Sequence, residues 1–598
     1  MKYAHLVGFA ALFLSGCASE GPSGKDAPLN SCTSDADCPS GVCASDGSEN
    51  LCVATHADLQ YLFLELDVPN HAPVAPGLHS VREASTFGLN LQGDSSEGFV
   101  RNVNLLTDSL FNVSATLQVK DLAPSCMALR EDNSIRTTIE LYPVNQPIGV
   151  SLAPYTGQYA KNWGGPKVLV PTGTYDVYLK PDLAAAPECT LPPVLIKEQT
   201  ITQNTELVFT RTKPATLVGH LDVPHPVGCA SDPLQCWQFD VLDNQRGRVL
   251  GGRQRVEAEG PKGTERFALD VWLPEKIPMA TIDRVLVVHP PAALRQKGMP
   301  DLFWKVNAID PDGNLDVSLQ VASLVDATSR FIALEANVQT PEDEPVSANV
   351  LISGRQLLGG VFGANAVFQV ASASDADGKF AANLLPGKYD IVVIPDASSK
   401  YALSLETWTI DVNDLGKGRT LKVKPVSRLL GQARTPSEGV AVGIPARLTA
   451  SSSEEMSLLE AAFSSGASSL LASLPRTSTA YTDSLGVFEL LADPGRLDLS
   501  LRPPSTTNFP WLVRRNIAID ASQPQALEFG ALTLAAPVVL VGTLLTPEGP
   551  PLAGATLRAW LAPAPSTSEM RPSAIVIGEA ATDDAGNYRL LLPPSASE

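Results

Sequence analysis

Short stretches of alternating apolar and polar residues, separated by turn residues, recur along most of this chain. In the segment 386–393, Pro-Gly precedes a strand in which Tyr389, Ile391 and Val393 share one face. Alternation with a period of two is typical of a strand with one buried face. The segments 172–179 and 494–499 repeat the pattern. It therefore predicts an all-β protein made of many short strands.

A tight turn followed by an alternating strand occurs three times in the second half of the chain. In each copy an aspartate caps the turn, a glycine supplies positive φ, and an aromatic residue two positions later returns to the core. The copies are 375–380, 482–488 and 582–588. Each follows a turn-and-strand segment, at 340–350, 435–448 and 546–557 respectively.

Together these motifs resemble those of the carboxypeptidase regulatory-like domain, a transthyretin-like β-sandwich. The resemblance covers 327–426, 427–535 and 536–598, whereas 56–213 carries only the last strand signature. The region 214–326 is assigned to a β domain from its length and alternation. The resemblance implies tandem transthyretin-like or Ig-like sandwiches. It implies no specific activity, because one fold serves many functions.

The last copy stops at 590–594, before the glycine-tyrosine strand that ends the other copies. A sandwich without its last strand has an open edge. Two explanations remain: the sequence is truncated, or another chain supplies the strand.

The fourth β domain contains an insertion between its two turn motifs. Ser452, Glu454, Leu459 and Phe463 have the spacing of a short capped helix. Because rim loops of sandwiches often bind partners, one hypothesis is that 452–474 contacts a partner. The alternative is a tolerated surface insertion.

The N-terminus has the features of an export signal. Lys2 precedes an apolar run over 6–14, and Leu14-Ser15-Gly16-Cys17 resembles a bacterial lipobox. The resemblance implies a signal peptide at 1–16, a lipidated Cys17 and a tether over 17–31. Ala18 in place of aspartate favours the outer membrane. The alternative is an ordinary signal peptide with a coincidental cysteine.

Eight cysteines remain, an even number that suits disulfides in an exported protein. A cysteine-rich segment, 32–55, contains half of them, and its pairing stays open among three possibilities. Its spacing and exported context argue against zinc. The disulfide candidates are Cys32, Cys38, Cys43, Cys52, Cys126 with Cys189, and Cys229 with Cys236.

The formal net charge of −20 excludes a nucleic-acid-binding role, because phosphate backbones would be repelled. The apolar stretch 531–545 is interrupted by Pro537 and Gly542 and is too short to span a membrane. It predicts two buried strands where two domains meet.

Catalytic motifs are not found in the sequence. The zinc motif H-x-x-E of metallocarboxypeptidases needs a glutamate three positions after a histidine. At that position six histidines of this chain have other residues, namely Leu59, Val74, Arg82, Val223, Gly228 and Ala292. G-x-S-x-G and P-loop motifs are also lacking. We therefore expect no catalytic residue and no cofactor.

Two groups of residues resemble metal sites weakly, and both are better explained as structural turns. His220 and His225 flank one short segment and are better explained as turn residues. The acidic segment Asp310–Asp316 has glycine at its fourth position, whereas an EF-hand loop needs it at the sixth. An Asp-Gly turn is favoured, and no metal site is expected.

The sequence thus predicts a lipid-anchored, non-enzymatic envelope protein whose sandwiches act as a spacer, adhesion or recognition scaffold. Its partners would be the membrane and an envelope protein or glycan. The alternative is a carbohydrate- or peptide-binding accessory lipoprotein, with Trp163, Trp237 and Trp304 as stacking candidates or, more simply, core residues. The expected β domains are 56–213, 214–326, 327–426, 427–535 and 536–598.

Overall fold

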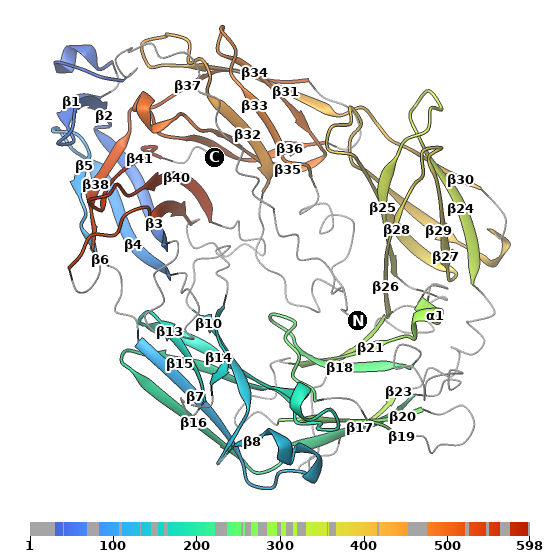
Figure 1. Ribbon diagram of the computed structural model, residues 1–598. Coiled ribbons are helices and arrows are strands. Elements are labelled where there is room, and N and C mark those ends of the chain that lie inside the picture. The colour runs from blue at the N-terminus through green and yellow to red at the C-terminus, as the bar shows by residue number, and fades with distance from the viewer. Residues whose placement is uncertain are drawn as a thin grey trace.

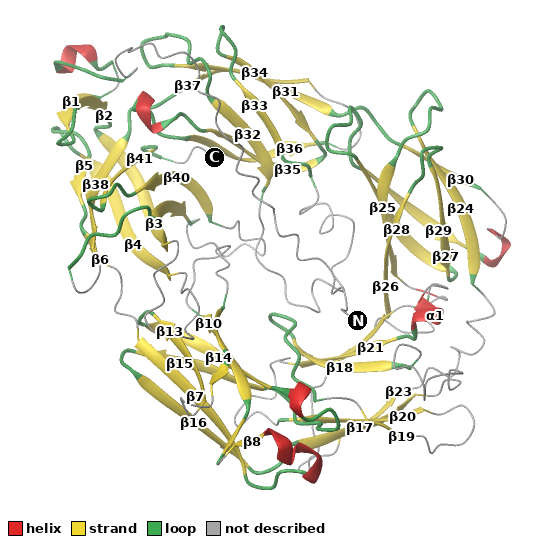
Figure 2. Ribbon diagram, in the orientation of Figure 1, coloured by secondary structure: helices red, strands yellow, loops and turns green. Residues whose placement is uncertain are grey.

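The computed structural model confirms an all-β protein (Figure 2). Helical structure in the described residues is limited to α1 (Ala292–Arg295) and short 3-10 turns, none long or apolar enough to cross a membrane. The structure describes residues 30–595 apart from 40, 69–82, 107–110, 132, 145–153, 161–164, 222–235, 253–254, 258–264, 273–283, 296–298, 300, 306–314, 320–330, 356, 358–365, 415–417, 452–474, 521–525, 546–548 and 563–573.

Sandwich D, the fourth along the chain, shows the repeated unit most clearly. In one sheet β31 lies between antiparallel β34 and parallel β37. In the other the order is β33-β32-β35-β36. The faces between the sheets are apolar, with Phe488, Leu448 and Leu499 buried. Its strands are β31 (Ser427–Arg434), β32 (Pro445–Ala450), β33 (Ser478–Tyr481), β34 (Val487–Ala492), β35 (Gly495–Leu501), β36 (Leu512–Ile519) and β37 (Ala526–Thr533).

Sandwich C, which precedes it, has the same strand order. Its Tyr389, the aromatic residue of the glycine-tyrosine motif, is buried and donates its hydroxyl to the Leu385 carbonyl over 2.7 Å. The strands of sandwich C are β24 (Ile332–Gln339), β25 (Ala348–Arg355), β26 (Ala366–Ala373), β27 (Lys379–Leu384), β28 (Gly387–Pro395), β29 (Ser404–Ile410) and β30 (Arg419–Lys422).

Sandwiches A and B are variants of this unit. Sandwich A adds short strands and comprises β7 (Phe111–Val119), β8 (Arg130–Glu131), β9 (Ser134–Ile135), β10 (Thr137–Pro143), β11 (Tyr155–Gly157), β12 (Tyr159–Ala160), β13 (Gly165–Val170), β14 (Gly173–Pro181), β15 (Val194–Ile201) and β16 (Thr205–Arg211). Sandwich B comprises β17 (Ala215–Leu221), β18 (Gln238–Asp243), β19 (Arg255–Glu257), β20 (Glu265–Val271), β21 (Arg284–His289), β22 (Asp301–Lys305) and β23 (Leu315–Leu319).

The last sandwich is completed by strands from the beginning of the chain, and we call it the closing sandwich. Strand β3 (His56–Val68) pairs antiparallel with β39 (Thr556–Leu561), and β4 (Glu83–Asp94) pairs with β3. β5 (Val100–Asn102) and β6 (Leu105–Leu106) pair parallel with β38 (Val538–Leu545). In the closing sandwich β3 therefore takes the place that β35 has in sandwich D, and β4 takes that of β36. The short strands β5 and β6 together take the place of β37. The other strands are β40 (Ile575–Ala581) and β41 (Asn587–Leu592).

This pairing differs from two sequence-based expectations. The region predicted as one sandwich, 56–213, is divided: its first four strands belong to the closing sandwich and its remainder forms sandwich A. The edge that the sequence left open at 536–598 is occupied by β3 from the same chain. Leu62, Leu64 and Leu66 of β3 are at most 1% exposed, because they complete the apolar core of this sandwich.

The cysteine-rich segment precedes β3 directly, and residues 30–55 are here called the stub. It contains the hairpin β1 (Val42–Ser45) and β2 (Asn50–Val53) and the disulfides Cys32–Cys43 and Cys38–Cys52. Its Leu51 and Val53 are fully buried against Val539 and Leu591 of the closing sandwich. The stub is therefore packed onto a sandwich.

The five sandwiches formed by the described strands follow one another around a ring (Figure 1). Early and late strands of the chain share both sheets of the closing sandwich, so the arrangement is not the extended row that tandem domains suggest. Between sandwiches B and C the sheet is continuous, because β22 pairs with β26.

Candidate functional site

Most of the buried charged groups in the described part of the chain lie at the joints between sandwiches. At the joint between A and B, Arg248 of sandwich B contacts Asp243 over 2.8 Å and Asp176 of sandwich A over 3.4 Å. All three side chains are at most 8% exposed. The Arg248 guanidinium also lies 4.7 Å from the centre of the Tyr142 ring. An arginine shared by two carboxylates and an aromatic face is held in one geometry, so this cluster sets the angle between the sandwiches.

Uncharged contacts extend the same joint. Tyr178 of sandwich A donates its hydroxyl to the Val249 carbonyl over 2.6 Å, and burial raises the pKa of this tyrosine far above its usual range. Trp272 of sandwich B donates its indole N–H to the Pro192 carbonyl over 2.9 Å. Asp270 accepts hydrogen bonds from Thr190 and Thr216, which lie on opposite sides of the joint.

At the joint between C and D, a single arginine reaches from one sandwich into the other. Arg476 of sandwich D pairs with Asp493 over 2.9 Å. Its guanidinium also donates to the carbonyls of Ala397, Ser399 and Tyr401 in a loop of sandwich C. Asp493 in turn accepts the Leu403 amide over 2.9 Å. The pair is almost fully buried, with side chains 7% and 3% exposed.

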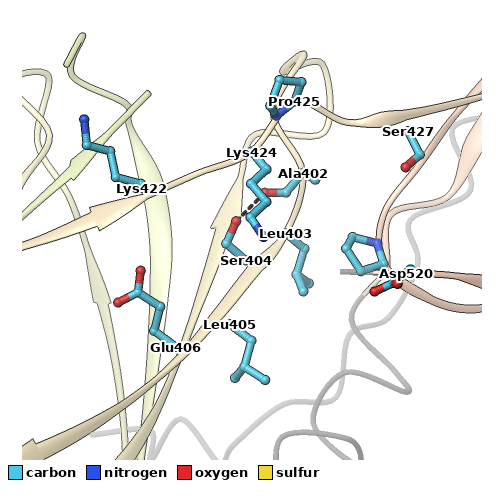
Figure 3. A pocket seen from close by; sticks show the side chains of 11 residues that line it. Ala402, Leu403, Ser404, Leu405, Glu406, Lys422, Lys424, Pro425, Ser427 and Asp520 are labelled. Carbon is cyan, nitrogen blue, oxygen red and sulfur yellow. Dashed lines mark hydrogen bonds between the residues drawn. The ribbon is translucent and has the colours of Figure 1, made fainter. Parts of the chain in front are cut away.

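A small pocket opens beside this joint (Figure 3). Its volume is about 140 Å³ and its lining comes from both sandwiches, including Ser404, Glu406 and Lys424 of C and Asp520 of D. Small-molecule sites usually measure ~300–1,000 Å³. The pocket is therefore too small to enclose a typical organic ligand, and it reflects how two sandwich ends meet.

The joint between D and the closing sandwich is covered by the stub. The buried Asn30 side chain donates to the Asn508 carbonyl of sandwich D over 3.0 Å and to the Cys52 carbonyl over 2.9 Å. Arg589 of the closing sandwich donates to the Asn508 side chain over 2.7 Å and also pairs with Asp46 of the stub. Three separate parts of the chain thus meet around Asn508.

One histidine of sandwich B lies between two carboxylates. His289 Nε2 is 3.4 Å from Asp240 Oδ2, and its Nδ1 is 3.2 Å from Asp301 Oδ1. Burial by itself lowers the pKa of His289, but the hydrogen bonds and charges of Asp240 and Asp301 outweigh it and raise the pKa to about 9. The imidazolium is therefore the stable form at neutral pH. Arg295 Nη2 pairs with Asp301 Oδ1 over 2.8 Å and also lies 3.2 Å from His289 Nδ1, so the cluster is an ion-pair network.

The predicted cysteines are placed as follows. Cys126 and Cys189 form a disulfide within sandwich A. Cys236 is disulfide-bonded, and its predicted partner Cys229 lies outside the described residues, as does Cys17. The Sγ atoms of Cys32, Cys38 and Cys43 lie within 4.8 Å of one another, but each belongs to a disulfide and offers no thiolate to a metal.

The other sequence candidates are not brought together. Trp237 is 1% exposed and packs in the core of sandwich B, so it cannot stack on a sugar. Trp304 lies in β22 and His220 in β17, on strands whose side chains at these positions are not described. The candidates Trp163, His225, Asp310 and the insertion 452–474 lie outside the described residues.

Sequence reasoning missed the joint residues. The sequence did contain a signal for one of them. In both sandwiches a Pro-Gly pair starts the last-strand motif, and the residue before it is Leu385 in sandwich C but Asp493 in sandwich D. Both are buried. A carboxylate at a position that is apolar in the sister copy requires a partner, and Arg476 provides it.

Comparisons with known proteins add no family. No protein-family model matches the chain, and no curated protein sequence matches it. Among solved structures, the Bacillus anthracis TIE protein matches with 12% identity and a TM-score of 0.15, over 67% of this chain and 69% of that one.

Two pilins also match, both at 12% identity. A shaft pilin of Lactobacillus rhamnosus GG has a TM-score of 0.18 over 35% of this chain and 97% of its own. The major pilin subunit of Bacillus cereus has a TM-score of 0.13 over 53% and 99%. Scores of this size do not define a shared overall fold, so the sandwich assignment rests on the strand pairing.

Proposed function

We propose that this protein is a lipid-anchored, non-enzymatic component of a bacterial cell envelope, in which a closed ring of β-sandwiches forms a rigid recognition scaffold. The sandwiches are taken as carboxypeptidase regulatory-like domains from their turn and strand motifs. The anchor is Cys17, and the outer membrane is its proposed location.

The closing sandwich is the observation that carries the scaffold proposal. A chain whose first strands complete its last domain cannot extend as a string of independent spacers. Its joints are held by buried groups. Arg248 pairs with Asp176 across one joint, and Arg476 donates from sandwich D to backbone carbonyls of sandwich C at another. Binding to a rigid surface avoids the entropy cost of ordering loops and domains.

The ring can be tested at its seam. Leu64 is fully buried between the sheets of the closing sandwich, so Leu64→Asp places an unpaired carboxylate in that core. Detachment of β3–β6 would open the ring, and the radius of gyration from small-angle X-ray scattering should rise. Val208→Asp is the matched control, because Val208 is 51% exposed on sandwich A. An unchanged radius of gyration in a folded Leu64→Asp protein would contradict ring closure in solution.

The anchor is tested independently. Labelling cells with a palmitate analogue should mark the wild-type protein and leave Cys17→Ser unmarked, and the variant should leave the membrane fraction. Equal labelling of both proteins would remove the lipid anchor from the proposal without affecting the ring.

The alternative function is carbohydrate or peptide binding by an accessory lipoprotein. The burial of Trp237 removes one of its three stacking candidates. Glycan-array binding that is lost on replacement of Trp163 or Trp304 would favour the alternative.

A further inference from the structure

Four large apolar side chains are exposed together at one end of sandwich D. They are Val440, Val442, Tyr481 and Leu485, with 44%, 52%, 72% and 64% of their surfaces exposed. The four lie in the loop 435–444 and at 481–486, where β33 ends and its following loop begins; we call these two segments the rim loops. Within the described residues eight large apolar side chains are exposed, so half of them lie in the rim loops. We call the four residues the apolar rim. Gathered apolar side chains on a folded surface usually mark an interaction site.

The two loops of the rim are held together by hydrogen bonds. The Thr482 hydroxyl accepts the Ile444 amide over 2.8 Å and donates to the Ala441 carbonyl over 2.7 Å. Asp483 accepts the amides of Leu485 and Val487, each over 2.8 Å. The rim is thus presented by ordered backbone, and binding would require little further ordering.

At three of the four rim positions the sister sandwiches carry smaller or polar residues, and at the fourth, Val440, they carry Pro345 and Pro551. The hydrogen-bonded turns align Leu485 with Asp377 of sandwich C and Ala585 of the closing sandwich. In the same alignment, Tyr481 corresponds to Ala373 of sandwich C and Ala581 of the closing sandwich. Val442 corresponds to Ser347 and Ala553 of the same two sandwiches. The turn itself therefore does not require large apolar residues, and their presence in sandwich D needs another explanation.

The rim lies at the same end of sandwich D as the point where the tether meets the fold. Tyr481 pairs with Pro445, and the Pro445 carbonyl accepts the Arg502 amide that follows β35. The next loop contains Asn508, which binds Asn30. Tyr481 ends β33, and the Asn508 loop leads into β36. In the sheet order β33-β32-β35-β36 these two strands are three strand spacings apart, or about 14 Å. Between Cys17 and Asn30 the chain can span at most ~45 Å.

We propose that the apolar rim rests on the lipid surface to which Cys17 anchors the chain; this inference depends on the proposed lipid anchor. Tyrosine and aliphatic side chains are favoured at the membrane interface. Glu438 and Asp483 are exposed beside the rim, and the chain carries a net charge of −20, so the lipid headgroups would be zwitterionic. Four side chains bind a membrane weakly by themselves, but the anchor makes their contact intramolecular.

The experiment compares amide hydrogen exchange of the full lipidated protein on phosphatidylcholine vesicles with that of soluble Cys17→Ser. Exchange in 438–443 and 481–486 should slow several-fold on vesicles. Exchange in the sister turn at 375–378 should not change. In the double variant Tyr481→Ala with Leu485→Asp, which has the sandwich C residues at both positions, the protection should disappear while vesicle attachment remains.

The outcomes separate the two proposals. Protein that floats with vesicles but shows solution-rate exchange at the rim overturns the membrane contact and leaves the anchor standing. Absence of fatty acid on Cys17 in the mass spectrum overturns both. Protection of the rim in concentrated Cys17→Ser protein without vesicles would assign it to a second copy of this chain and would also overturn the proposal.

Discussion

Trp560 donates its indole N–H to Glu65 Oε2 over 2.7 Å, although the two residues are 495 positions apart. Glu65 is only 6% exposed, and Arg558 Nη1 lies 3.8 Å from its other oxygen. The bond joins β3 to β39 across the seam of the ring. It links an early strand to a late one through a buried carboxylate and a half-buried indole.

Removal of this acceptor should weaken the seam. Glu65→Ala removes the hydrogen bond between the Trp560 N–H and a charged acceptor, and such bonds contribute about 1.5–3 kcal/mol. Glu65→Gln keeps an acceptor oxygen and should cost less. Native-state hydrogen exchange of the β3 and β39 amides measures the opening free energy at the seam. Equal losses in both variants would show that the charge, and not the hydrogen bond, stabilises the pairing.

Loss of Arg476 should loosen the joint between sandwiches C and D. Arg476→Ala leaves Asp493 buried without its ion pair, and breaking such a pair costs about 3–5 kcal/mol. Arg476→Lys should not restore the joint, because an ammonium cannot reach three carbonyls and a carboxylate together. Limited proteolysis in the loop 397–403 gives the readout. Arg428→Ala is the control, since its exposed pair with Glu489 should contribute almost nothing.

The cluster around His289 should make stability depend on pH. Its pKa is 6.5 in the unfolded chain and about 9 in the folded protein, so the folded state binds the proton more tightly. The stabilisation is fully present below pH 6.5 and is lost as pH rises through about 9. The difference in urea midpoint between wild type and His289→Asn should therefore shrink over this interval. A difference that stays constant from pH 6 to 10 would contradict the assignment.

The disulfide of sandwich A should be the most stabilising cross-link among those whose two cysteines are described. Cys126 and Cys189 are separated by 63 residues, and in the chain-entropy model closing a loop of this length contributes about 4 kcal/mol. Cys126→Ala with Cys189→Ala should lower the unfolding temperature of sandwich A. The corresponding replacement of Cys32 and Cys43, 11 residues apart, should have a smaller effect on the stub. Calorimetry of both double variants compares them.

Local features followed directly from the sequence. The alternation around Tyr389 predicts a strand, and β28 is that strand with Tyr389, Ile391 and Val393 buried. The aspartate-capped turns are also present, since Asp375, Asp483 and Asp583 each accept backbone amides of their own turn. Such features depend on neighbouring residues, so the sequence contains the information needed to predict them.

The candidate sites were less accessible to prediction. The sequence candidates lay in motifs and loops, whereas the buried ion pair of Arg248 and Asp176 lies at a joint. Those partners are on different sandwiches and share no motif. The one detectable signal was the difference between two copies of a motif, which have Leu385 and Asp493 at equivalent positions.

By itself the sequence determined an all-β chain of turn-punctuated strands with apolar inner faces, because period-two alternation and turn chemistry act over a few residues. It could not determine that β3 completes the last sandwich. The alternating leucines of β3 present a face that any sheet with a free edge could accept. The intervening sandwiches and their joints bring that face to β39, so the tertiary structure alone decided the closure of the ring.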